Sequence, residues 1–284
     1  MKTVRQLALS VLLECNAGRK ATAALALSSE GDIGPDERLT EPHGVPGRPP
    51  LPVLASHKAL KQRSMVTVAG RATLIHALAH IELNAIDLAV DIVWRFDALP
   101  KEFYSDWISV AREEAMHFQL LRAHLQSLGF DYGDFPAHNG LWEMAEKTKG
   151  DLLARLAIVP RTLEARGLDA CPAVKNKLVR AGDTRAGEIL DIILRDEIRH
   201  VRIGNDWYRR LCAERNLDPA ATFSELVRSY DAPRPRGPFN LAARRAAGFD
   251  EQELADLTNG SHLLARENAT GAKVNDPLPL KLPR

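Results

Sequence analysis

Apolar residues recur every three or four positions over long stretches of the chain, which is the spacing of helices that bury one face. Strand-like alternation is rare, so the central part of the chain is predicted to be all-α. Glycine or proline follows three of the long stretches, and Asp183 is a good N-cap for the last one. The pattern predicts four long helices at 71–96, 101–128, 151–165 and 183–212, and short ones at 141–149 and 173–179.

The two ends of the chain differ from this central part. Residues 1–29 have helical spacing, whereas residues 31–52 contain so much glycine and proline that an extended segment is expected. After the central helices, short helices are predicted at 218–230, 240–247 and 250–257, before a polar tail expected to be disordered. We therefore expect an N-terminal helix plus Pro/Gly-rich wrap (1–63), a bundle (64–212), a helical extension (213–264) and a tail (265–284).

Composition and charge narrow the function classes. The 284 residues include 38 Lys+Arg and 37 Asp+Glu, and a formal net charge of +1 argues against a surface for non-specific nucleic-acid binding. No stretch reaches the roughly 18 apolar residues of a membrane span, so no membrane association is expected. The first helix is amphipathic rather than a signal peptide, and the three widely spaced cysteines predict no disulfide framework. A cytoplasmic location is expected.

Two of the predicted helices carry the tetrapeptide Glu-x-x-His, as Glu114 to His117 and as Glu197 to His200. Residues three apart lie on neighbouring positions of a helix, so both side chains can reach one metal ion or a close pair. One such tetrapeptide is weak evidence, because both residue types are common on solvated faces. Here each pair lies within an apolar stripe, where a carboxylate is costly unless it is paired or binds a cation.

A further glutamate lies on the apolar side of the helix that precedes each pair. Glu82 precedes Glu114 by 32 residues, and Glu164 precedes Glu197 by 33. Two helix hairpins therefore carry the same order of residues, a glutamate followed by Glu-x-x-His. In four-helix bundles this order supplies the ligands of carboxylate-bridged di-iron and di-manganese sites.

The chemistry of such a site accounts for the residue types. Four glutamates balance two divalent ions, and one histidine completes the coordination of each ion. Carboxylate and imidazole suit iron or manganese, with iron slightly favoured, whereas the absence of thiolates disfavours structural zinc. In the usual arrangement Glu114 and Glu197 bridge the ions, and Glu82 and Glu164 are terminal. His117 and His200 are the remaining ligands.

Four other residues are candidates for supporting the ligands. Glu113 and Asp196 each precede a ligand glutamate and are rotated from it by about 100°, so they face water or orient a neighbouring histidine. His124 lies one heptad after His117, where contact with the site competes with ordinary packing. Arg161 is close in sequence and could balance the charge, although a solvated arginine is the commoner case.

Two further histidines, one proline and a group of C-terminal arginines have structural interpretations that compete with functional ones. His76 and His80 point about 120° and 200° away from Glu82 and are predicted to pack between helices. Pro160 is predicted to kink its helix, which either opens a path beside the metals or is purely structural. A surface or an intramolecular cover is favoured over RNA contact for the C-terminal arginines Arg228, Arg234, Arg236, Arg244 and Arg245.

With these residues identified, the sequence resembles the ferritin-like superfamily, and most closely the family catalogued as domain of unknown function 455. The resemblance covers about residues 64–211 and rests on the motifs at 76–88, 111–118, 132–138, 164–169 and 195–201. It implies an all-α, ferritin-like four-helix bundle with additional N- and C-terminal helices. The ferritin-like ligand positions are filled by Glu82, Glu114, His117, Glu164, Glu197 and His200.

The leading functional hypothesis is a dinuclear-metal oxidoreductase that uses O₂ to oxidise a small organic substrate, with an electron-donor protein as a partner. The alternative is metal storage or simple binding, although the roughly 60 residues before the bundle and 70 after it argue against cage assembly. A degenerate scaffold is disfavoured because all ligand positions are filled. The superfamily also contains a tRNA-modifying hydroxylase, a remote analogy. Nucleic acid is not an expected partner, and a homodimer is compatible with this organisation.

Overall fold

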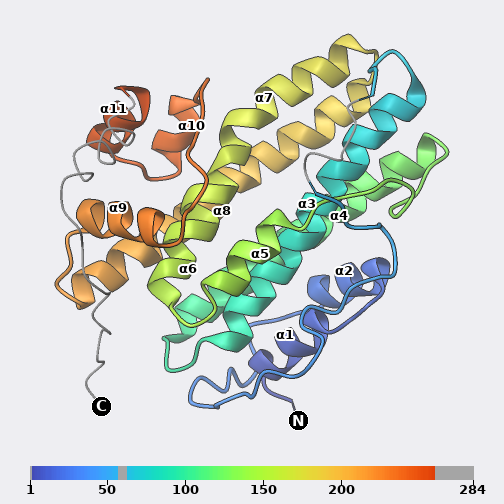
Figure 1. The fold of residues 1–284 in the computed structure, drawn as a ribbon. Helices are drawn as coiled ribbons and strands as arrows, with labels where there is room; N and C mark the ends of the chain where they lie inside the picture. Colours follow the sequence, from blue (N-terminus) through green and yellow to red (C-terminus); the bar gives the residue numbers. More distant parts are fainter. Residues whose placement is uncertain (1, 57–62, 260–284) are drawn as a thin grey trace.

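The computed structural model describes residues 2–56 and 63–259, which form an all-α helical bundle (Figure 1). The predicted all-α class is confirmed. Four long helical segments lie side by side: α3 (Val68–Arg95), α4 (Lys101–Ser127), the run α6 (Leu152–Ile158), η2 (Val159–Glu164) and α7 (Ala165–Arg180), and α8 (Thr184–Glu214). Shorter helices surround them: α1 (Val4–Leu12), α2 (Ala17–Leu25), α5 (Gly140–Lys147), α9 (Pro219–Ser229), α10 (Leu241–Ala246) and α11 (Glu251–Asn259).

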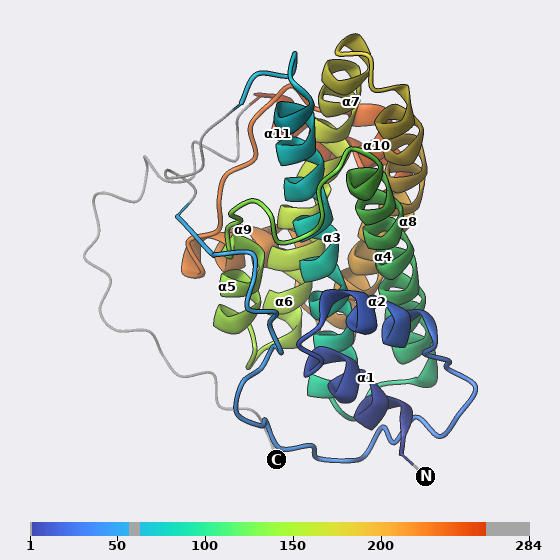
Figure 2. The same cartoon turned by 90° about the vertical axis from the view of Figure 1, so that its right-hand side faces the viewer.

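Helix α3 is the central helix of the bundle and packs along α4 (Figure 2). It begins after Thr67, whose hydroxyl accepts a hydrogen bond from the Gly70 N–H at 3.1 Å. Among the described helices, α3 is long and apolar enough to cross a membrane by length and composition alone. However, 72% of the apolar stretch is buried inside the protein, as expected of a core helix.

The third long segment differs from the prediction. The expected helix end near Gly167 and the separate helix at 173–179 are both wrong, because α7 continues through them to Arg180. A glycine costs a helix only about 1 kcal/mol relative to alanine, and buried Leu168 and Leu178 hold this part of the helix on the protein. The expected disturbance at Pro160 is present as the π-helix η2, since proline has no N–H to donate to the preceding turn.

The π-helix η2 packs very close to α8, at the contact between Pro160 and Gly204. A Cβ atom on Gly204 of α8 would lie 2.5 Å from the Cβ of Pro160, so a larger residue does not fit there. Glycine at this position therefore lets the two segments pack at short range. The contact fixes η2, which ends at Glu164, against the helix that carries Glu197.

The N-terminal region contains two helices instead of the single one expected, and both belong to the main hydrophobic core. Helix α1 packs on α3, and α2 packs on α4 and α3. The ammonium group of Lys20 in α2 is buried and forms an ion pair with Asp87 of α3. The extended segment that follows crosses the bundle, where the Ala55 N–H donates to the Ala137 carbonyl at 2.8 Å.

The C-terminal extension packs on the opposite part of the bundle. Helix α9 contacts α6, and α10 contacts both α7 and α8. The predicted helices at 218–230, 240–247 and 250–257 correspond to α9, α10 and α11. The predicted tail at 265–284 lies outside the described residues.

Candidate metal centre

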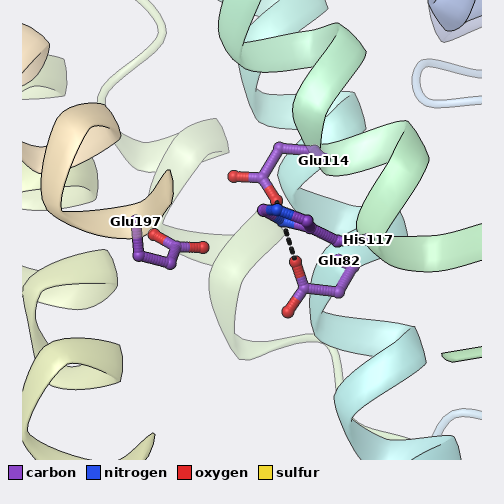
Figure 3. Close-up of side chains that lie close together, drawn as sticks. All are labelled: Glu82, Glu114, His117 and Glu197. Atoms are coloured by element: carbon purple, nitrogen blue, oxygen red, sulfur yellow. Dashed lines mark hydrogen bonds and ion pairs between the residues drawn. The ribbon is translucent and has the colours of Figure 1, made fainter. Parts of the chain in front are cut away.

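Four of the six predicted ligands converge inside the bundle. Glu82 of α3, Glu114 and His117 of α4, and Glu197 of α8 each offer one ligand atom, and these atoms lie within 4.8 Å of one another. Figure 3 shows the four side chains directed from three helices toward one space. Residues far apart in sequence meet because the two helix hairpins pack with their apolar stripes facing each other.

His117 is held from both sides of its ring. Its Nδ1 atom faces the glutamates, 3.3 Å from Oε2 of Glu82 and 3.4 Å from Oε2 of Glu114. Its Nε2 atom lies 3.1 Å from Oδ2 of Asp196, which belongs to α8. An Nε2–H that donates to Asp196 leaves Nδ1 with its lone pair directed toward the glutamates.

His200 has the same arrangement with the helices exchanged. Its Nε2–H donates to Oε2 of Glu113 on α4 at 2.7 Å. Its Nδ1 atom lies 2.9 Å from Oε1 of Glu114 without the alignment of a hydrogen bond. The residue preceding each Glu-x-x-His motif thus supports the histidine of the other motif, and the two rings lie 5.9 Å apart.

Glu164 lies beside this cluster, on the wall of a cavity that also reaches Glu82 and Glu197. Its Oε2 atom is buried without a hydrogen-bond partner in the described structure, and so is Oε2 of Glu197. An unpaired buried carboxylate oxygen is costly, and a bound cation removes that cost. Glu164 therefore has the environment of a ligand although it is not among the four most closely spaced residues.

The four glutamates respond differently to their burial. Burial, together with the charge of Glu114, raises the pKa of Glu164 to about 8 and that of Glu197 well above its usual value. Burial likewise raises the pKa of Glu82 to about 7, against the lowering effect of its hydrogen bond with His117. Burial also acts on Glu114, but the facing histidines outweigh it and hold its pKa below the usual range.

The pKa values of the two histidines are raised by the same contacts. Burial lowers the pKa of His117, but its hydrogen bonds with Glu114 and Glu82 outweigh burial and raise it to about 12. The same opposition, with the charge of Glu114 as the main raising effect, brings the pKa of His200 to about 10. Without a cation, protons must therefore neutralise the carboxylates.

The donor set fits divalent metal ions. In the described part of the chain, no lysine or arginine forms a hydrogen bond or ion pair with any of the four glutamates. The buried oxygens of Glu164 and Glu197 and the Nδ1 atom of His200 have no hydrogen-bond partners, and carboxylate oxygens and imidazole nitrogens are ligands of iron and manganese. The buried cluster can therefore hold a metal.

Two predicted supporting residues lie elsewhere. The Nε2 atom of His124 is 2.9 Å from Oδ1 of Asp183, so this histidine supports the start of α8 rather than the cluster. The Arg161 guanidinium donates to Asn205 and pairs with Glu253, and it lies over the rings of Tyr208, Phe223 and Phe249. In contrast to expectation, Arg161 is buried and holds the C-terminal extension through these contacts.

Sequence reasoning missed the cavity next to the cluster. It measures about 1190 Å³ and is bordered by α3, α7, α8 and the segment 233–239. From its sequence, this segment is only a proline-rich stretch with arginines, and an intramolecular cover is one of the two roles expected for it. No local pattern indicates that it reaches the glutamates, because folding alone brings residues 164 and 236 to one cavity.

The crossed support of the histidines leads to a prediction. Glu113→Gln or Asp196→Asn is expected to weaken Mn(II) binding by about 10–100-fold, because the amide no longer fixes the imidazole as an Nε2–H donor. Affinity is measured by competition with a metal-binding dye. Asp191→Asn is the matched control, since Asp191 lies on α8 and pairs with Lys175 at the surface. Equal affinities for Asp196→Asn and Asp191→Asn would show that the support has no effect.

The described residues thus form a helical-bundle protein with a buried glutamate–histidine cluster that can hold a metal. The chain belongs to the family described as "Protein of unknown function (DUF455)", whose model matches residues 13–255. An "Uncharacterized protein" of Haemophilus influenzae is 49% identical over 213 residues, which cover 72% of this chain and 74% of that protein. No solved structure matches the chain significantly. The resemblance of the sequence motifs to the domain of unknown function 455 family is confirmed.

Proposed function

We propose that this chain is a ferritin-like, carboxylate-bridged dinuclear metal protein that catalyses an O₂-dependent oxidation of a small organic substrate. The observation that carries the proposal is the crossed pairing of the two Glu-x-x-His motifs around Glu114. One oxygen of Glu114 faces His200 and the other faces His117. This is the placement of a bridging carboxylate between two ions, each with its own histidine.

The chain's own residues have separate roles in this proposal. Glu82, Glu114, Glu164 and Glu197 would hold the two ions together with His117 and His200, with Glu114 and Glu197 as the carboxylates shared between them. Glu113 and Asp196 hold the Nε2–H groups so that both Nδ1 lone pairs face the ions. Two iron or manganese ions, when bound, supply the redox chemistry toward O₂, and an electron-donor protein supplies reducing equivalents.

The cavity favours catalysis over storage. It reaches three of the four glutamates and has apolar walls that include Leu163, Leu190 and Ile193. A storage site needs a path for ions but no apolar chamber for an organic molecule. A tRNA substrate, the remote alternative, finds little support in a net charge of +1. We propose a cytoplasmic location, and a homodimer is compatible with this organisation.

Oxygen uptake tests the proposed activity. Fe(II)-loaded protein is mixed with O₂ in the presence and absence of fractionated metabolite pools, with a chemical reductant as electron donor. We expect a fraction that raises O₂ uptake well above that of the loaded protein alone and yields an oxidised product. Uptake that no fraction changes, with iron accumulating beyond two ions per chain, would instead indicate storage.

The pKa shifts predict how metal binding depends on pH. Glu82 and Glu164 have folded-state pKa values of about 7 and about 8, above the ordinary 4.5, so the metal-free fold loses stability as pH rises through this range. His117 and His200, raised above 6.5, lose their contribution in the same direction. Bound cations replace these protons. The gain in melting temperature on adding Mn(II) should therefore be larger at pH 8 than at pH 6.5; an equal or smaller gain would contradict the account.

A further inference from the structure

The cavity beside the glutamates has two chemically different parts. Its lining includes Glu82, Glu164 and Glu197 together with apolar side chains from α3, η2, α7 and α8. The apolar set consists of Leu78, Ile81, Ala85, Leu163, Val174, Leu190 and Ile193. This part suits a hydrocarbon portion of a ligand rather than a strongly hydrated one.

The lining also contains basic residues. Three arginines border the same cavity: Arg166 from α7, and Arg234 and Arg236 from the segment 233–239. All three are exposed, and none forms a hydrogen bond or ion pair with another described residue. In contrast, most arginines buried in the bundle are paired, as Arg155 is with Asp91.

The one aspartate in the lining does not neutralise these arginines. Asp169 pairs with Arg244 at 2.7 Å and accepts a hydrogen bond from the Asn240 N–H at 3.0 Å. Its charge is therefore already balanced by a residue outside the cavity lining. Within residues 2–56 and 63–259 nothing else pairs with the three guanidinium groups, and arginine has planar donors that suit an anion.

The segment that carries two of these arginines is held in place at both ends. It runs along α7 in Figure 1, between α9 and α10. Before it, the Ala232 N–H donates to the Val227 carbonyl at 3.0 Å, and after it Asn240 is bound to Asp169 and Leu168 of α7. Pro233, Pro235 and Pro238 restrict the backbone between these anchors. Arg234 and Arg236 are thus presented with a small loss of backbone entropy on binding.

We propose that this cavity binds an amphipathic organic anion, a molecule with a carboxylate or phosphate group and an apolar chain. The arginines of α7 and of the segment 233–239 bind the anionic group. The apolar chain lies against α3 and α8 and extends toward Glu82, Glu164 and Glu197. The further step, that the bound anion is the substrate, rests on the proposed function. Binding of the anion depends on the three arginines, which hold no metal.

Calorimetric titration tests the proposal with probes that share one chain length. Decanoate and decyl phosphate carry the two anionic groups, 1-decanol is neutral and decylamine is cationic. The charged probes are used below their micelle concentrations and 1-decanol below its solubility limit. We expect at least one anion to bind about tenfold more tightly than 1-decanol, with the carboxylate and phosphate arms showing which group is preferred. Both metal-free and Mn(II)-loaded full-length protein are titrated, so failure to bind metal does not hide binding of the probe.

A triple variant tests the arginines directly. Arg166→Gln/Arg234→Gln/Arg236→Gln should reduce the affinity for the anion about tenfold and leave that for 1-decanol unchanged. The matched control is Arg38→Gln/Arg180→Gln/Arg228→Gln, which removes the same charge from exposed arginines outside the cavity. Equal affinity for the anions and 1-decanol, preference for decylamine, or the same loss in the control would overturn the proposal.

Discussion

Glu114→Gln is expected to abolish binding of both metal ions. Glu114 faces both histidines, with Oε1 2.9 Å from Nδ1 of His200 and Oε2 3.4 Å from Nδ1 of His117. An amide of the same size has only one acceptor oxygen and no charge, so it cannot bridge two cations. The loss should exceed the roughly 10–100-fold caused by removing a supporting partner. Metal content is measured by mass spectrometry after reconstitution with Fe(II) under anaerobic conditions.

Glu102→Gln provides the control for this variant. Glu102 lies in the first turn of the same helix and is exposed to solvent. Its substitution removes the same charge at a distance from the cluster. It should retain the metal content and O₂ uptake of the unaltered protein. If Glu114→Gln also retained two ions per chain, Glu114 would not be a bridging ligand.

Lys20→Ala is expected to lower the free energy of unfolding by about 3–5 kcal/mol, because it leaves a buried carboxylate without its partner. The Lys20 ammonium group is buried and pairs with Asp87, joining α2 to the central helix. Burial raises the pKa of Asp87, and the charge of Lys20 opposes that effect. Urea unfolding of the metal-free protein at pH 7 measures the loss.

Two further variants separate the ion pair from the loss of side-chain volume. Lys147→Ala removes an exposed lysine of α5 and should change stability by less than about 0.5 kcal/mol. The double variant Lys20→Met/Asp87→Leu replaces the pair by apolar groups and should recover most of the lost stability. A Lys20→Ala variant as stable as Lys147→Ala would mean that the N-terminal helices contribute little to the bundle.

Most of the fold follows from apolar periodicity, but a single glycine does not always end a helix. Helices α3, α4 and α8 were predicted to within a few residues, because each buries a continuous stripe. Gly167 predicts a helix end, yet α7 continues because residues on either side of it, Ala165 and Leu168, are buried. That continuation depends on tertiary contacts with α8, which propensity does not contain.

For the candidate site too, local sequence does not show which partners a buried residue has in the folded protein. A carboxylate in an apolar stripe singled out Glu82, whereas Asp87 and Asp91 of the same helix lie about 140° and 180° round the axis from it and are nevertheless buried as well. The structure pairs Asp87 with Lys20 and Asp91 with Arg155, whereas no described basic residue other than a histidine contacts Glu82. Since those partners lie about 65 residues away, local sequence could not distinguish a salt bridge from a metal ligand. The repeated Glu-x-x-His order made that distinction.

Metal stoichiometry is the most direct test of a dinuclear centre. Protein reconstituted anaerobically with Fe(II) or Mn(II) and freed of excess metal is crystallised, and anomalous scattering is recorded at the absorption edge of the metal. We predict two anomalous peaks, each beside the Nδ1 atom of His117 or His200, with Glu114 between them, and two ions per chain in solution. No bound metal, or a single ion away from both histidines, would contradict the account.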